Sequence, residues 1–330
     1  MTTSMRPTID RRHFIKRSFF GLACLSGLDL ASFGQKKMAK IAICKTQDRE
    51  EGIRNVLEIF EYSSMKNKQV LIKPNFNTSD PYPGSTHNLT LSQLIKEIHK
   101  QEVSEIIVGE RSGPPPTARV LEEKHIHELA EEFNFKTVNF EELEEEDWVH
   151  FNPSGNHWEN GFYLARPAVE AEYLVSTCCL KTHQYGGVFT MSLKLSVGLT
   201  PKRLMRELHR SPDMRKMIAE INLGYKPQLI VLDGVEAFVD GGPMKGERKE
   251  ANIFLAGDDR VAIDAVGIAV LKDLGSNQAI MGRKIFEQEQ IARAVELGLG
   301  ISSPDQIEFL TPDKKSQEYA EKLRKILAQG

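Results

Sequence analysis

The chain is poor in cysteine, with four residues in 330, and none of them forms a CxxC pair or a ferredoxin-type spacing. It also lacks the GxGxxG and Walker A patterns of dinucleotide- and nucleotide-binding folds. It has no HExxH motif, and His125 and His127, two positions apart on a predicted helix, cannot share a face. These absences argue against a ferredoxin-type iron–sulfur cluster, a nucleotide site of either common type and a zinc site with its own motif.

An excess of positive charge is also missing. The chain has 43 basic and 46 acidic residues, for a net charge of −3. A mildly acidic protein is a poor partner for nucleic acid, so we expect no nucleic-acid partner. Beyond the N-terminal segment, no apolar run approaches the roughly 20 residues of a membrane-spanning helix, and we expect no membrane span in the mature chain.

The N-terminal segment, residues 1–34, resembles a bacterial twin-arginine export signal. Arg11-Arg12 is followed by Phe14-Ile15-Lys16, then by a short apolar run and the small residues Ser32 and Gly34. The pattern predicts the twin-arginine translocation machinery as a partner and the periplasm as the destination, with an uncleaved signal as a means of retention. Residues 35–330 would then form a mature chain of net charge −6, because the signal holds five basic and two acidic residues. The alternative is a basic amphipathic N-terminus that stays on the protein.

Strand-like and helix-like segments alternate along the rest of the chain. The predicted strands cover residues 40–44, 70–72, 106–108, 173–180, 227–232 and 253–257, and the principal helices cover 52–62, 89–99, 117–133 and 260–274. This order predicts an α/β fold with a mainly parallel sheet covered by helices on both faces. We expect a single domain over residues 35–330, with a small irregular insertion at about 141–170.

Ionisable residues follow four of the predicted strands. Lys73 follows residues 70–72, Glu110 follows 106–108, Lys181 and His183 follow 173–180, and Asp233 follows 227–232. Ligands of open α/β sheets bind beyond the carboxyl ends of the strands. The sequence therefore predicts a charged cleft at this edge.

The lysines point to an anionic ligand. Lys73, Lys181 and Lys194 are candidate contacts for a phosphate or carboxylate, and Asn75 is a candidate amide donor. Lys181 and His183 lie on the same side of an extended strand, where a lysine and an imidazole suit the polarising or protonating of an anionic group, so they are the catalytic candidates.

Glycines and carboxylates complete the candidate site. A glycine-rich segment containing Gly242 and Gly246 predicts a loop whose backbone N–H groups wrap an anion or close as a lid. Glu110, Asp233 and Asp264 are candidate ligands of a divalent metal, the one cofactor that these side chains suggest, or else candidate partners that orient the lysines.

Cys178 and Cys179 lie side by side in the predicted strand 173–180. An apolar strand buries its side chains, and burial makes a thiol inert. We therefore expect a structural role for both, with redox chemistry as the alternative.

The ordered set of motifs resembles a known family. The set comprises Lys73-Pro74-Asn75, Lys181-Thr182-His183, Thr190, Lys194, Asp233-Gly234, Gly242-Pro243, Gly246, Asp258 and Asp264-Ala265. It is similar to the pattern of the domain of unknown function 362 family, over about residues 70–300. Many members are exported or carry ferredoxin-type clusters, but this chain lacks the cluster cysteines. Leu195 also departs from the asparagine that usually follows the lysine.

Two hypotheses about function share this site. In the first, the chain is an enzyme that acts on an anionic phosphate or carboxylate substrate, with His183 as acid or base and a divalent metal as candidate cofactor. In the second, it is a non-catalytic binder of an anionic ligand, a metal complex or a cofactor in the cell envelope. The sequence names neither the reaction nor the ligand.

Overall fold

The computed structural model describes residues 38–330, and the predicted export signal lies outside the described residues. The described residues belong to one compact unit. Its strands are β1 (Ala39–Lys45), β2 (Gln69–Lys73), β3 (Glu105–Glu110), β4 (Lys136–Asn139), β5 (Trp148–Phe151), β6 (Phe162–Ala165), β7 (Tyr173–His183), β8 (Val188–Thr190), β9 (Leu229–Gly241), β10 (Gly246–Gly257) and β11 (Ile307–Leu310).

Most strands are separated by helices. These are α1 (Arg49–Ile59), α2 (Asn88–His99), α3 (Thr117–Glu123), α4 (Ile126–Phe133), α5 (Arg166–Val169), α6 (Ser192–Leu195), α7 (Met205–Arg210), α8 (Met214–Ile221), α9 (Arg260–Asp273), α10 (Gln278–Met281), α11 (Glu289–Glu296) and α12 (Lys314–Gln329). The predicted helix 117–133 is interrupted at His125, which adopts a left-handed conformation between α3 and α4.

The main sheet has the strand order β11-β1-β10-β9-β7-β2-β3-β4, with β8 added beside β7. Neighbouring strands are parallel except at β10, which is antiparallel to β1 and β9, and at β8, which is antiparallel to β7. The predicted α/β fold with a mainly parallel sheet is therefore correct. Strands β7, β2 and β3 are adjacent and parallel, so their carboxyl ends meet at one edge.

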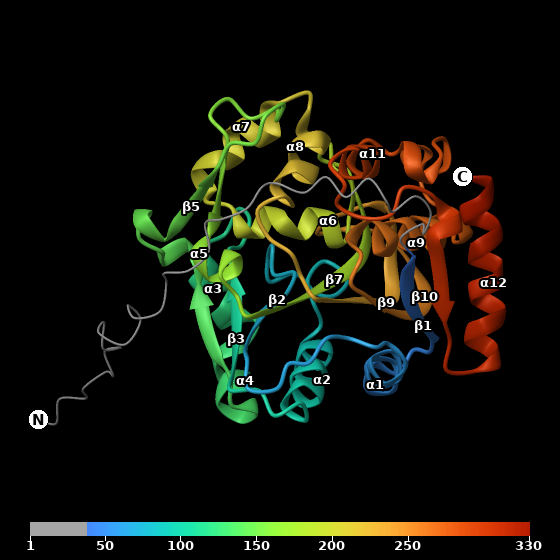
Figure 1. Ribbon diagram of the computed structural model, residues 1–330, viewed down its shortest axis with the longest axis horizontal. Coiled ribbons are helices and arrows are strands. Elements are labelled where there is room, and N and C mark those ends of the chain that lie inside the picture. The colour runs from blue at the N-terminus through green and yellow to red at the C-terminus, as the bar shows by residue number, and fades with distance from the viewer. Residues whose placement is uncertain (1–37) are drawn as a thin grey trace, which may run out of the picture. The chain divides into compact units, whose positions relative to one another are not determined.

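Helices cover both faces of the sheet (Figure 1). Successive residues of a strand face opposite sides, so Ile41 and Ile43 pack with α9 and α12, whereas Ala42 and Cys44 pack with α1 and α2. In Figure 1, α1, α2 and α4 lie below the sheet, and α6, α9 and α11 lie above it. Burial on both faces explains why the strands are nearly continuous apolar runs.

The expected insertion at 141–170 contains a separate two-stranded antiparallel sheet, β5 and β6. Its apolar side chains, including Trp148 and Phe162, form a third core cluster with α7, α8 and Leu174 of β7. The hairpin therefore helps to cover the face of the sheet that carries Leu71 of β2 and Leu174 of β7.

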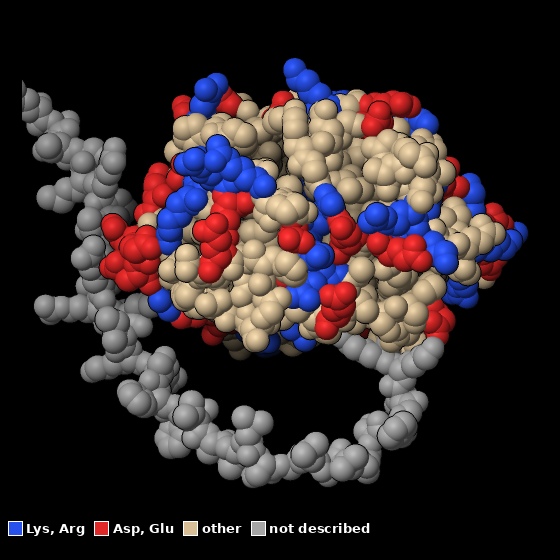
Figure 2. Space-filling model, turned by 90° about the horizontal axis from the view of Figure 1, so that it is seen from above, with Lys and Arg blue, Asp and Glu red and all other residues tan. Residues whose placement is uncertain are grey.

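No helix within residues 38–330 combines the length and apolar composition that crossing a bilayer requires. The face in Figure 2 shows basic and acidic side chains interspersed with larger neutral areas, and they do not gather into one continuous basic surface.

Candidate functional site

A small polar cavity of about 50 Å³ lies where β2, β3 and β7 end. It is bounded by Lys73, Asn75, Asn77, Glu110, Arg111, Lys181, His183, Thr190, Lys194, Leu195, Val197, Gly198 and Pro243. The structure thus brings together six of the residues singled out in the sequence, namely Lys73, Asn75, Glu110, Lys181, His183 and Lys194. The lining contains four cationic side chains and a single carboxylate, so the cavity is suited to an anion.

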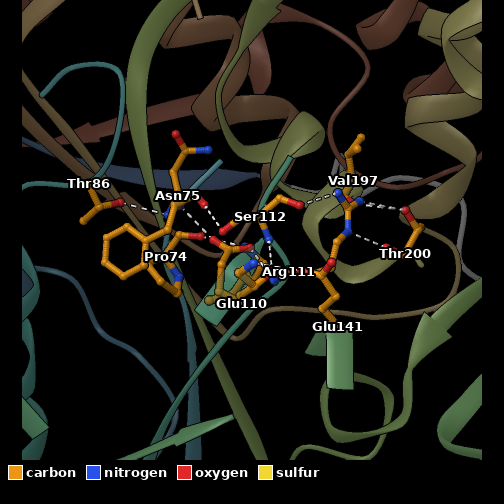
Figure 3. A network of polar contacts seen from close by, with 12 residues as sticks. Pro74, Asn75, Thr86, Glu110, Arg111, Ser112, Glu141, Val197 and Thr200 are labelled. Atoms are coloured by element: carbon orange, nitrogen blue, oxygen red, sulfur yellow. Dashed lines mark hydrogen bonds and ion pairs between the residues drawn. The ribbon is translucent and has the colours of Figure 1, made fainter. Parts of the chain in front are cut away.

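Lys73 and Glu110 form a buried ion pair at the ends of β2 and β3. The Lys73 Nζ lies 2.6 Å from Glu110 Oε1 and donates to the carbonyl of Pro74 at 2.7 Å. The carboxylate of Glu110 also accepts from the backbone N–H groups of Phe76, at 2.7 Å, and Arg111, at 2.8 Å (Figure 3). Burial lowers the pKa of Lys73, and the neighbouring Glu110 opposes that shift. The pair fixes the chain as it leaves two adjacent strands.

Arg111 is held almost entirely by neutral oxygen atoms. Its guanidinium group donates to the carbonyls of Thr200 at 2.7 Å and Ser112 at 3.0 Å, and also to that of Val197 (Figure 3). Burial lowers the pKa of Arg111 to about 10, although Glu110 and Glu141 act in the opposite direction. At neutral pH the group remains a fixed positive charge on the cavity wall.

Lys181 is likewise a buried cation, and no carboxylate within residues 38–330 contacts it. Its ammonium group donates to Asn75 Oδ1 at 2.7 Å and to the carbonyl of Gly84. The backbone of Asn75 is in turn fixed by Thr86, which accepts from Asn75 N through its hydroxyl group and donates its own N–H to Asn75 O. Asn75, predicted to contact the ligand, therefore orients Lys181 through its amide oxygen. Burial lowers the pKa of Lys181.

Lys194 and His183 are the two basic groups of the cavity that have unused hydrogen-bonding capacity. Among residues 38–330, no oxygen atom forms a hydrogen bond or ion pair with the Lys194 ammonium group, and His183 Nδ1 is buried without a partner. Burial, reinforced by Lys181 and Arg111, lowers the pKa of Lys194 to about 7. Burial, reinforced by Lys194 and Lys181, lowers the pKa of His183 to about 2. The imidazole is therefore neutral at physiological pH, and the amine exchanges its proton readily.

Asp264 positions the short helix that carries Lys194. One carboxylate oxygen accepts from the N–H of Ser192 at 2.7 Å, and the other accepts from the N–H of Leu193 at 3.1 Å. Burial raises the pKa of Asp264 to about 7, and these two hydrogen bonds oppose the shift. Asp264, predicted as a metal ligand, instead caps the first turn of α6.

The three predicted metal-binding carboxylates do not meet. Glu110 pairs with Lys73 and Asp264 caps α6, while Asp233 lies 3.0 Å from Arg49 Nε and accepts from the hydroxyl of Thr90. Asp233 and Glu110 belong to strands three positions apart in the sheet, a separation of roughly 14 Å. No cluster of three His, Cys, Asp or Glu side chains within the described part of the chain is arranged to hold a metal. In the described part of the chain these three carboxylates are therefore not grouped around one ion, and Glu110 takes the alternative role of orienting a lysine.

Gly242 and Gly246 do not form an open anion-binding loop. Residues 229–241 and 246–257 pair as the long antiparallel hairpin of β9 and β10, in which Gly246 lies opposite Gly241. The N–H of Gly242 donates to Lys245 O at 2.8 Å, so it is used within the turn. Only Pro243 of this turn borders the cavity.

Cys178 and Cys179 are buried in β7, each about 1% exposed, and both are free thiols. Burial raises the pKa of Cys179 to about 11 and also raises the pKa of Cys178 well above its usual value. Both thiols therefore stay protonated, as expected for structural cysteines.

The sequence patterns did not single out three residues of the site, Arg111, Gly187 and Gly198. Arg111 directly follows Glu110 at the end of β3, and its place just beyond a strand end could have marked it as a candidate site residue. Gly198 and Gly187 matter because they have no side chain. A Cβ on Gly198 would lie 2.7 Å from both Lys73 Nζ and Glu110 Oε1, and one on Gly187 would lie 2.8 Å from Lys194 Cε. A methyl group at either position would displace a charged side chain.

Comparisons with known proteins give a family and distant structural likenesses. A thylakoid-associated protein of Synechocystis is 27% identical over 118 residues, which cover 34% of this chain and 36% of that protein. The chain thus matches about a third of the length of this curated relative. The lactate racemase apoprotein of Thermoanaerobacterium thermosaccharolyticum is similar with a TM-score of 0.41 and 15% identity, covering 86% of this chain and 85% of the other.

A second solved structure, of a protein from Thermotoga maritima, has a TM-score of 0.42 and 12% identity, covering 68% of this chain and 56% of the other. The family model described as "Domain of unknown function (DUF362)" matches residues 70–269, more than half of the chain. This match contains the ends of β2, β3 and β7 and the helix of Lys194. The chain therefore belongs to the DUF362 family, as the motif set indicated.

Proposed function

We propose that this protein binds a small molecule through a carboxylate or phosphate group in the cavity at the ends of β2, β3 and β7. We also propose that Lys194 moves a proton on the bound ligand while neutral His183 orients that ligand. The observation that carries the proposal is the excess of buried positive charge. Arg111 and Lys181 are held by neutral oxygen atoms, and Lys194 is held by none within residues 38–330. A bound anion would supply the missing counter-charge.

The cationic residues would have two different roles, a structural one and a ligand-binding one. Lys73 is neutralised by Glu110, so this pair maintains the cavity wall. Arg111, Lys181 and Lys194 then remain to attract the anionic group. The cavity of about 50 Å³ is small enough that a carboxylate or phosphate would fill it and leave the rest of the ligand outside.

Lys194 is the candidate for acid–base catalysis. An efficient proton-transfer group has a pKa near the working pH, and the pKa of Lys194 is lowered to about 7 by its burial. Protonated Lys194 would help to hold the anion, and its neutral form would accept a proton that leaves the ligand. His183 lines the same cavity and is neutral, and with its pKa lowered to about 2 it would orient the ligand through a hydrogen bond and not act as a base.

Binding and catalysis are tested separately on the full chain. Titration calorimetry at pH 6.5 with acetate, pyruvate, inorganic phosphate and phenyl phosphate should detect binding, and Lys194→Met should weaken it by about tenfold, or about 1.4 kcal/mol. Absence of binding by all four anions would overturn the proposal.

Catalysis is tested by proton NMR in D₂O, which follows the C–H signals of a wider set of carboxylates and phosphate esters. If bound ligands keep those protons and remain unchanged, the proposed proton transfer is wrong and the protein is better described as a non-catalytic binder.

We also propose that residues 1–34 direct export to the periplasm by the twin-arginine route, on the basis of Arg11-Arg12 and the apolar run that follows. A reporter fused to these residues should be exported, and Arg11→Lys with Arg12→Lys should block that export. Export that continues in the double variant would contradict this assignment.

A further inference from the structure

A second, much larger cavity adjoins the small cationic one. The outer cavity has a volume of about 600 Å³, against about 50 Å³ for the inner one. Six residues border both, namely Asn77, Arg111, His183, Lys194, Val197 and Pro243. The two cavities are therefore compartments of one site, with Lys194 and His183 at their junction.

The walls of the outer compartment differ in chemistry from those of the inner one. Six of its lining side chains are wholly or largely apolar, namely Pro114, Tyr185, Val197, Met205, Pro243 and Met244. Among the described residues that line it there is no aspartate or glutamate, and all of its charged lining residues are basic. Of these, Lys202 is already paired, at 2.7 Å, with Glu141 outside the cavity. The compartment thus offers apolar contact area and repels no anion.

Tyr185 marks the mouth of the outer compartment. It lies two residues beyond His183, the last residue of β7, and its ring meets that of His183 edge-on, with centroids 6.0 Å apart. Tyr185 is 55% exposed and is the only aromatic residue among the large exposed hydrophobic side chains of residues 38–330. A ligand body in the compartment would cover part of this ring, and Met205 and Met244 have the flexible side chains that adapt to different shapes.

We infer that the ligand is an amphiphilic anion, with its carboxylate or phosphate in the inner cavity and an aliphatic or aromatic body of several carbons in the outer one. This inference rests on the proposed function and adds the ligand class to it. A small anion such as acetate would leave the outer compartment filled with water against apolar walls. A ligand with an apolar body would displace that water and gain affinity from each carbon that it buries.

The test compares ligands of increasing chain length on the full protein. Titration calorimetry with acetate, butyrate, hexanoate and octanoate at pH 6.5 should show affinity rising by about twofold to fourfold per methylene, where fourfold corresponds to about 0.8 kcal/mol. An affinity that does not rise with chain length would overturn the inference, while binding of acetate would still support the proposed function.

Hexanol separates the failure of the inference from the failure of the proposed function. It has the same apolar chain as hexanoate but no charge, so it should bind at least tenfold more weakly if the head group occupies the cationic cavity. Equal binding of hexanol and hexanoate would contradict the proposed function, even if chain length still mattered.

Matched methionine variants locate the effect. Met205→Gln and Met244→Gln keep the side-chain length but place a polar amide in the outer compartment, so each should reduce the ratio of octanoate affinity to butyrate affinity by at least threefold. Met281→Gln makes the same change on α10, at a residue that is 44% exposed and does not border the compartment, and should leave the ratio unchanged. An equal effect of all three substitutions, or no effect of the first two, would show that the alkyl chain of the ligand binds outside the outer compartment.

Discussion

Lys73 Nζ and Glu110 Oε1 lie 2.6 Å apart, and both side chains are 2% exposed. The pair joins the ends of two adjacent parallel strands, because Glu110 also accepts from the backbone N–H groups of Phe76 and Arg111. One carboxylate therefore holds the first residues beyond β2 and β3 in place. The cavity depends on this contact even though neither charge is free to meet a ligand.

The first prediction concerns the stability that this pair provides. Glu110→Gln leaves the Lys73 ammonium buried without a counter-charge and should lower the free energy of unfolding by about 3–5 kcal/mol, measured by urea denaturation at pH 7. As a control, Glu61→Gln removes the partner of Lys40 in an exposed ion pair with a separation of 3.4 Å, and it should have little effect. Equal losses in the two variants would contradict the role given to Glu110.

A double variant tests the cause of that loss. If the cost comes from an unpaired buried charge, Lys73→Met combined with Glu110→Gln should recover at least about 1 kcal/mol relative to Glu110→Gln alone. If the cost comes only from the hydrogen bonds to Phe76 and Arg111, the second substitution should recover nothing.

The second prediction is a pH-dependent effect of Lys194 on stability. Its pKa is lowered from an ordinary value of 10.5 to about 7 in the folded protein. Between these two pH values the unfolded chain binds more protons at this residue, so the stability of the folded protein rises with pH across that interval. Below pH 7 both forms are protonated, and the cost of burying the charge is present in full.

Lys194→Met removes this cost. Without ligand, the variant should be more stable than the wild type at pH 6 by roughly 2–4 kcal/mol, and the difference should shrink steadily towards pH 9.5. Urea denaturation at pH 6, 8 and 9.5 measures this change. A difference that is the same at all three pH values would show that the ammonium group is solvated or already paired.

The strand pattern predicted much of this site. Lys73, Glu110, Lys181 and His183 each follow an apolar run, and the rule that ligands bind at the carboxyl ends of parallel strands was enough to group them. The structure brings these four together because β7, β2 and β3 are neighbours. The sequence contains no direct signal for that neighbour order, although it favoured a parallel sheet.

The same rule failed for Asp233, for a reason that the sequence does not show. Strand β9 continues beyond Asp233 to Gly241, so this carboxylate does not lie at a strand end. Its partner, Arg49, is 184 positions away on α1, a contact set by tertiary packing. The glycines and the proline of 241–246 predict an open loop, but β9 and β10 pair as far as Gly241 and Gly246 and leave only a tight turn between them.

The third prediction concerns the cysteines. Cys44, Cys178 and Cys179 are each about 1% exposed, and burial raises the pKa of all three thiols. In native protein none of them should react with a thiol reagent at pH 8 over an hour, whereas all three should react in 8 M urea. Mass spectrometry of the labelled peptides assigns each modification. Rapid native labelling of Cys178 or Cys179 would revive the redox hypothesis.

The fourth prediction uses Gly187, where a methyl group would touch both basic groups of the cavity. Its Cβ would lie 2.8 Å from Lys194 Cε and 3.0 Å from His183 Cγ. Lys194 is flexible at that point, so Gly187→Ala should fold, but the ammonium group must move. We expect hexanoate affinity to fall by about tenfold, or about 1.4 kcal/mol, as measured by titration calorimetry.

Gly298→Ala is the matched control for this change. Gly298 has a φ of +67° and no neighbouring atom within 4 Å of its Cβ position, so alanine there should cost about 1 kcal/mol of stability through backbone strain alone. It should not alter hexanoate affinity, since Gly298 borders neither compartment of the cleft. If both variants weaken binding to the same extent, general destabilisation explains the loss. If only Gly187→Ala does so, the positions of Lys194 and His183 determine affinity.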